Sequence, residues 1–221
     1  MSQPGFSQSS SADSHHLPPE RSGWPIWPWI LVLAASALIV LTRWGGVPKP
    51  PPESEEPRGE RHPTVGQRIT TFALQPLTGD SHVVSEADLA DKVTLINFWG
   101  PWCSACAIEF PHLVELESHF RPKPGFQFFS VSSNYNPSDE RGLVEGTKEF
   151  LKRYKADFPT YRDPDGNTVI SLARGLQLTD FGYPCTVLLG PGGVIRGLWI
   201  GFIPGDEEAV RLAIEKALNK T

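Results

Sequence analysis

Two cysteines separated by two residues, Cys103 and Cys106, are the side chains of this sequence best suited to chemistry. They follow an apolar run and open a segment, 104–120, that is predicted to be helical. The unpaired N–H groups and the dipole at a helix start stabilise negative charge. A thiol pKa near ~8.5 can fall to roughly 3.5–7.5 there, and the thiolate is a nucleophile. The second cysteine, about one helical turn on, could attack a mixed disulfide formed by the first, which predicts dithiol–disulfide exchange.

Other roles for a Cys-x-x-Cys pair fit this sequence less well. A structural zinc site needs about four ligands, and the chain has one such pair. Attachment of a c-type haem needs histidine after the second cysteine, where this chain has Ala107. A purely structural disulfide stays open, although it gives no reason for the pair to lie at a helix start.

Composition divides the chain into four parts. Residues 1–21 are polar and predicted to be disordered, and 45–66 form a linker rich in proline and charge. Residues 67–221 have the length of a single domain. The net charge of −5 and the pI of about 5.7 give no basic footprint, so nucleic acid is not expected as a partner.

Residues 22–44 are predicted to be a transmembrane anchor. The stretch 22–42 carries no charge, and a helix of that length spans roughly the ~30 Å apolar core of a bilayer. Tryptophans gather at both of its ends, as they do at membrane interfaces: Trp24, Trp27, Trp29 and Trp44. A signal peptide cleaved after Ala37 is the alternative. The flanking Arg and Lys residues do not decide the orientation.

The apolar pattern predicts an α/β domain. Strands alternate with helices early and a hairpin comes late, which indicates a central mixed sheet covered by helices. The expected strands are 71–74, 82–84, 93–99, 127–132, 186–189 and 194–200, and the expected helices are 104–120, 148–154, 168–172 and 206–218.

Three motifs around the cysteines resemble those of one family. They are Asn97-Phe98-Trp99, Trp102-Cys103-x-x-Cys106 and Glu109-x-Pro111. Over roughly 67–218 the chain resembles the TlpA/ResA-like branch of the thioredoxin superfamily. The resemblance implies a thioredoxin fold behind an N-terminal transmembrane helix, with Cys103 as the attacking thiol and Cys106 as the resolving thiol. It also implies a bacterial inner membrane location with the catalytic domain on the extracytoplasmic side.

The resemblance extends to a second segment, around Pro184. It implies that Pro184 is the cis-proline that faces the cysteine pair, and that the backbone of Tyr183 pairs with the extended chain of a client protein. Trp102, beside the first cysteine, is a further candidate for client contact. An ordinary trans-proline at a strand start is the alternative.

Glu109 is the candidate proton acceptor. It lies three residues after Cys106 and therefore on the same helical face, from which it could accept the proton of that thiol. Thioredoxin has a buried aspartate at the strand position occupied here by Asn97, so Glu109 is the remaining acid, as it is in the ResA-like branch. A solvated helix residue is the alternative.

Two positions depart from the family pattern. Cys185 follows the predicted cis-proline, where a threonine or another small residue is usual. It is expected to be a small buried apolar residue, with a competing disulfide as the alternative. The inner dipeptide Ser104-Ala105 differs from the common x-Pro, and the inner residues help to set the reduction potential, so the direction of electron flow stays open.

The resemblance favours a reductant of protein disulfides. Its clients would be apocytochrome c or another exported thiol protein, and a DsbD/CcdA-like membrane protein would supply electrons. Neither a cofactor nor a metal is implied. Two rivals remain. A peroxiredoxin usually has Thr or Ser three residues before its attacking cysteine, where this chain has Gly100. A copper-handling assembly protein usually has a Cys-x-x-x-Cys spacing, one residue longer than here, and a distal histidine.

Overall fold

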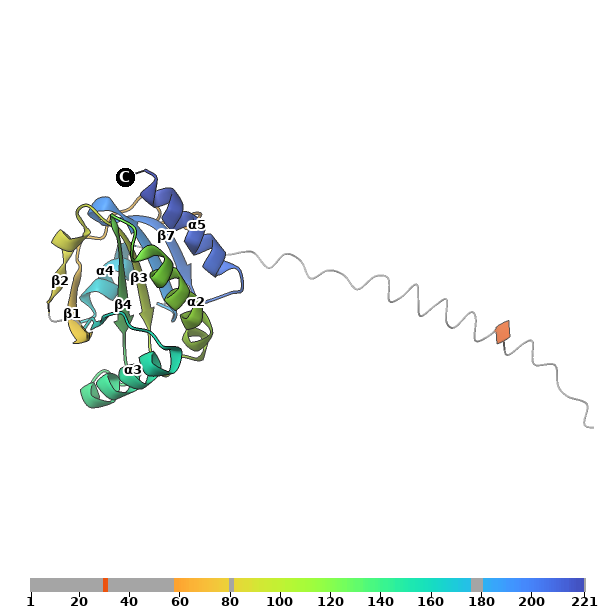
Figure 1. The fold of residues 1–221 in the computed structure, drawn as a ribbon, viewed down its shortest axis with the longest axis horizontal. Helices are drawn as coiled ribbons and strands as arrows, with labels where there is room; N and C mark the ends of the chain where they lie inside the picture. Colours follow the sequence, from red (N-terminus) through yellow and green to blue (C-terminus); the bar gives the residue numbers. More distant parts are fainter. Residues whose placement is uncertain (1–29, 32–57, 80–81, 176–180, 221) are drawn as a thin grey trace, which may run out of the picture. The chain divides into compact units, whose positions relative to one another are not determined.

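The computed structural model describes residues 30–31, 58–79, 82–175 and 181–220 (Figure 1). The predicted N-terminal segment 1–21, most of the predicted anchor and residues 45–57 of the predicted linker lie outside the described residues. Within the part of the chain that is described, no helix is both long and apolar enough to cross a membrane.

A seven-stranded mixed sheet forms the centre of the domain, in the order β2-β1-β5-β4-β3-β6-β7. The strands are β1 (Ala73–Thr78), β2 (Val84–Ser85), β3 (Val93–Trp99), β4 (Phe126–Ser132), β5 (Thr160–Arg162), β6 (Cys185–Gly190) and β7 (Val194–Ile200). Strands β3, β4 and β5 are parallel to one another, and the other pairs are antiparallel. The predicted mixed sheet flanked by helices is confirmed.

Helices cover both faces of this sheet. They are α2 (Ser104–Phe120), α3 (Glu140–Tyr154), α4 (Asn167–Gly175) and α5 (Asp206–Leu218), with short 3-10 turns η1 (Glu86–Leu89) and η2 (Pro191–Gly193). Buried side chains of α2, α3 and α5 pack on one face. Those of α4 and η1 pack on the other. All seven residues of β3 are buried, because alternate side chains of this central strand enter the two cores.

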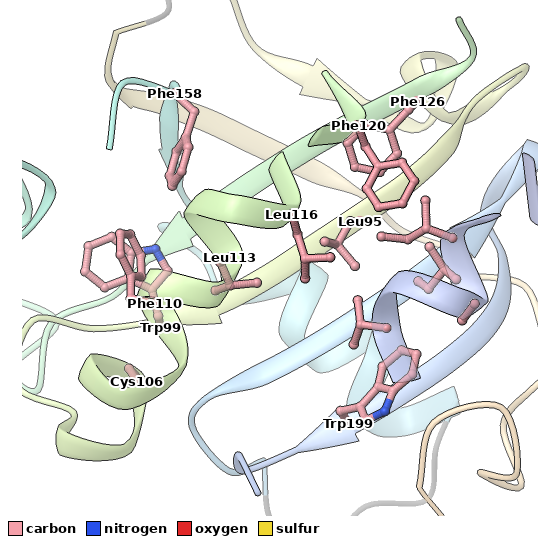
Figure 2. Packing of buried hydrophobic residues seen from close by; sticks show 14 of the residues in the cluster. Leu95, Trp99, Cys106, Phe110, Leu113, Leu116, Phe120, Phe126, Phe158 and Trp199 are labelled. Atoms are coloured by element: carbon pink, nitrogen blue, oxygen red, sulfur yellow. The ribbon is translucent and has the colours of Figure 1, made fainter. Parts of the chain in front are cut away.

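The helix that carries the cysteines is fixed by aromatic packing at its first turns. Phe110 of α2 lies against Trp99 at the end of β3, with ring centroids 4.8 Å apart (Figure 2). Both rings also contact Phe150 of α3. The indole N–H of Trp99 donates to Ser130 Oγ at 2.8 Å. This packing holds the end of β3 and the start of α2 in one geometry, and the start of α2 carries the cysteine pair.

The bounds of β3, α2, β7 and α5 are those predicted from the sequence. Helix α3 begins at Glu140 rather than at 148, because the Asp139 carboxylate accepts the N–H of Gly142 at 2.9 Å and caps the helix start. The three-residue strand β5 was not predicted. It is too short to show an apolar period, and pairing with β1 and β4 defines it.

The domain begins earlier than the predicted boundary at residue 67. Gly59 exchanges backbone hydrogen bonds with Leu198 of β7, at 2.6 and 3.2 Å, and Thr64 is buried. The end of the predicted linker therefore covers the outer edge of β7, a strand that would otherwise expose unpaired backbone groups. Charge and proline content at 45–66 gave no sign of this pairing.

Candidate active site

Cys103 is the N-cap of α2 and forms a disulfide with Cys106. The backbone N–H of Cys106 donates to the sulfur of Cys103 at 3.1 Å, and the first turn of α2 contains no acidic residue. A thiolate formed on Cys103 would therefore face a donor N–H group and the positive end of the helix dipole. Cys103 is 6% exposed and Cys106 is fully buried, so an external disulfide can approach only the first sulfur.

Glu109 lies in the core behind the pair, so the alternative of a solvated residue is wrong. It is 6% exposed. Its two carboxylate oxygens accept hydrogen bonds from Thr186 Oγ1 and Asn97 Nδ2, each at 2.8 Å. Burial raises the pKa of Glu109 from 4.5 to about 7, against the opposing effect of the Thr186 and Asn97 hydrogen bonds. A carboxyl with this pKa can take up and release a proton near neutral pH.

Asn97 and Thr186 come together because their strands are neighbours. They are directly opposite each other in the antiparallel pair β3–β6, and Asn97 Nδ2 also donates to Thr186 Oγ1 at 2.9 Å. The sequence analysis did not identify Thr186 as a residue of the site. Its signal was its position two residues after Pro184, where strand alternation turns the side chain toward the cysteine face of the sheet.

Cys185 lies on the other face of the sheet. It is opposite Phe98, packs in the core formed with α4, and is fully buried as a free thiol. Burial strongly raises the pKa of the Cys185 thiol. The expected small buried residue is confirmed. A disulfide with Cys103 or Cys106 is not supported, because both belong to the core on the opposite face.

We expect the Cys185 thiol to be inert in the folded protein. An alkylating reagent applied to the oxidised protein should label no cysteine under native conditions and one in denaturant, since the neutral buried thiol is neither accessible nor ionised. Mass spectrometry of the labelled protein checks this. Rapid native labelling at Cys185 would contradict the placement, and the Cys185→Ala variant controls for labelling elsewhere.

The predicted client-contacting residues form an aromatic rim. The Tyr183–Pro184 bond is cis, as expected. Trp102 is 44% exposed, donates its indole N–H to the Ser133 carbonyl at 3.0 Å, and meets the Tyr183 ring edge-on at 5.4 Å. Tyr135, which the sequence analysis did not identify, is 83% exposed, and its ring centroid lies 5.8 Å from that of Trp102.

A groove of about 620 Å³ runs from this rim along the ends of β3, β4 and β5. Its lining includes Tyr183 of the rim, Ser133, Asp163 and Val169. The groove places a concave surface beside the cis-proline, where an extended polypeptide could lie.

Comparison with known proteins agrees with this geometry. The AhpC/TSA family profile matches residues 65–198. The chain is 29% identical over 177 residues to the thiol:disulfide interchange protein DsbE of Pseudomonas fluorescens biotype C, covering 80% of this chain and 86% of the relative. It is 29% identical over 107 residues to the thiol-disulfide oxidoreductase ResA of Bacillus subtilis (strain 168), covering 48% of this chain and 54% of that protein.

A crystal structure from Chlorobium tepidum, described as that of a candidate thiol:disulfide interchange protein DsbE, is similar in fold. It has 30% sequence identity and a TM-score of 0.54, and the match covers 70% of this chain and 97% of that one.

Proposed function

The chain belongs to the AhpC/TSA family and is a thiol-disulfide oxidoreductase, and we propose that it reduces disulfides of exported client proteins. One observation carries this proposal most strongly. The cysteine pair opens a helix in which the attacking residue is 6% exposed and the resolving residue is fully buried, and a buried carboxyl of raised pKa lies one turn after the resolving cysteine.

The reaction would proceed in two exchanges. The Cys103 thiolate attacks one sulfur of a client disulfide, forms a mixed disulfide and releases the other client sulfur as a thiolate. Glu109, as a carboxylate, accepts the proton of Cys106. The resulting thiolate attacks the Cys103 sulfur, which forms the Cys103–Cys106 disulfide and releases the second client thiolate. Two electrons pass to the client, and the carboxyl later returns its proton to water.

The aromatic rim and the groove would hold the client during these steps. The backbone of Tyr183, set by the cis-proline Pro184, would pair with the client's extended chain next to the attacked cysteine. Trp102, whose ring meets that of Tyr183, would contact the client beside the attacked sulfur, and the groove would take the residues that follow.

We further propose that residues 22–44 anchor the domain to a membrane on its extracytoplasmic side, with 45–57 as the linker. Support comes from the uncharged stretch, its flanking tryptophans and the resemblance to the TlpA/ResA-like branch. On the same resemblance, apocytochrome c is the favoured client, and a DsbD/CcdA-like membrane protein would reduce Cys103–Cys106 after each cycle.

The peroxidase alternative meets a steric obstacle at Gly100. A Cβ atom at this position would lie 2.6 Å from the Ser133 carbonyl oxygen and would overlap the indole of Trp102. A threonine or serine side chain three residues before Cys103 therefore does not fit without moving both.

A peptide substrate tests the proposed function. The reduced soluble domain should convert a disulfide-closed Cys-x-x-Cys-His peptide, the motif of c-type haem attachment, to its dithiol while the protein becomes oxidised at one disulfide per peptide. Peroxide consumption and Cu(I) titration, run in parallel, separate the two rivals. Rapid peroxide turnover with no transfer to the peptide would contradict the proposal.

A further inference from the structure

The side chain of Arg58 joins the N-terminal segment of the domain to the loop between β7 and α5. Its guanidinium donates to the carbonyl oxygens of Ile200 and Gly201, at 2.6 and 3.2 Å. It also donates to Asp206 Oδ2 at 2.5 Å, in an ion pair whose side chains are 23% and 11% exposed. Arg58 thus meets three acceptor groups from the short stretch 200–206 at one point.

Asp206 connects this ion pair to the buried acid of the active site. The same Oδ2 atom accepts the N–H of Ile203 at 2.9 Å, which fixes the carboxylate at the first residue of α5. Asp206 and Glu109 both line a small cavity of about 10 Å³ between α2, β7 and α5. A cavity of that size is at the lower limit for one water molecule.

The charged and titratable groups around Glu109 come from α2, α5, β6 and the start of the domain, while Asn97 of β3 and Trp199 of β7 are uncharged. Its own helix α2 contributes His112 and the cysteine pair, α5 contributes Asp206 and Glu207, β6 contributes Cys185, and the N-terminal segment contributes Arg58. Two of these groups act on Glu109 in opposite directions. The charge of Asp206 raises the pKa of Glu109, and that of Arg58 lowers it.

We propose that Arg58 and Asp206 are positioning residues for the disulfide exchange, because their ion pair fixes the electric field in which Glu109 takes up the proton of Cys106. The inference rests on the proposed role of Glu109 as proton acceptor. Neither residue touches the sulfur atoms. Arg58 holds the Asp206 carboxylate and offsets its charge, so Glu109 faces a nearly neutral pair instead of an unbalanced anion.

The two single variants should therefore shift Glu109 in opposite directions. Arg58→Gln leaves the Asp206 charge unbalanced and should raise the midpoint of the Glu109 titration by about half a unit to one unit. At pH 7 the resolving step should then slow by about two- to fivefold, since less carboxylate is present. Asp206→Asn keeps an oxygen for Ile203 but removes the anion, and should lower the midpoint. The double variant should return close to the wild type.

The test is a titration of the Glu109 carboxyl by NMR in protein with carbon-13-labelled glutamate, assigned with Glu109→Gln, alongside the pH profile of the resolving step. Glu60→Gln is the matched control. It breaks the exposed ion pair between Glu60 and Lys216, 2.7 Å apart, in the same N-terminal segment but outside the Glu109 cavity. Arg58→Lys takes its place if Arg58→Gln fails to fold. This variant keeps the charge, so its Glu109 midpoint should equal that of the wild type.

Opposite shifts in the two single variants, cancellation in the double variant and no shift in Glu60→Gln would support the inference. Equal midpoints in all folded variants, or a uniform loss of rate at every pH, would overturn it and leave the ion pair a structural one. The proposed function fails separately, if the reduced wild-type protein leaves the disulfide-closed Cys-x-x-Cys-His peptide oxidised.

Discussion

Replacing Cys106 by serine should arrest the protein as a mixed disulfide between Cys103 and its client. The first exchange needs only the Cys103 thiolate at the start of α2, which this variant retains. The second exchange loses its nucleophile, so multiple-turnover reduction should fall by about 1,000-fold or more. Non-reducing electrophoresis and mass spectrometry of the adduct measure both effects.

Cys103→Ser is the matched control for this experiment. It retains a thiol at residue 106, but that side chain is fully buried and cannot be reached by a client. The Cys103 variant should form no adduct and should also be inactive. Adducts of similar yield on both single variants would contradict the assignment of Cys103 as the attacking residue.

Replacing Glu109 by glutamine should slow the resolving step by about 100-fold at pH 8. Glutamine keeps the shape of the side chain and an acceptor for one of the bonds from Asn97 and Thr186, but it takes up no proton from Cys106. The wild-type rate should rise as the pH increases through about 7, the pKa of Glu109, while the variant should lose this rise. Stopped-flow measurement of mixed-disulfide resolution from pH 5.5 to roughly 9 gives the comparison.

The stability of the same variant shows whether a lower rate comes from damage to the fold. The pKa of Glu109 rises from 4.5 to about 7 on folding, so the folded state binds the extra proton between these values. The free energy of unfolding of the wild type should therefore fall as the pH increases from 4.5 to 7, by about 3 kcal/mol from this group. Glu109→Gln should lack that fall and be no less stable than the wild type at pH 8.

Urea titrations of both proteins at pH 5 and pH 8 measure this difference. The Glu109→Gln variant could instead be much less stable than the wild type at pH 8. That result would show that the hydrogen bonds from Asn97 and Thr186 stabilise the carboxylate by more than its desolvation costs. The role of Glu109 as an easily protonated base would then lose its physical support.

The sequence predicted best the parts of the site that depend on neighbours in the chain. The Cys-x-x-Cys pair, its position at the start of α2 and the strand β3 before it follow from a continuous apolar run and a helical segment, and all have the expected bounds. Glu109 was found because a spacing of three residues on one helix fixes its face relative to Cys106.

The partners of Glu109 were harder to predict, because they come from separate elements. Thr186 meets Glu109 only through the register of β6 against β3. Arg58 lies in a stretch whose charge and proline content indicate a linker, and its contact with Asp206 joins residues far apart in the sequence. Cys185 was expected near the redox pair because it follows Pro184, but strand alternation sends it to the other face of the sheet.

The reduction potential of the Cys103–Cys106 couple tests the central claim most directly, because the inner residues Ser104-Ala105 do not decide the direction of electron flow. It can be measured by equilibrating the protein with glutathione or dithiothreitol buffers and quantifying the two thiols. A client reductant requires a potential near ~−270 mV, the value of thioredoxin. A potential near ~−120 mV, that of the strong oxidant DsbA, would contradict the account and make this protein a donor of disulfides.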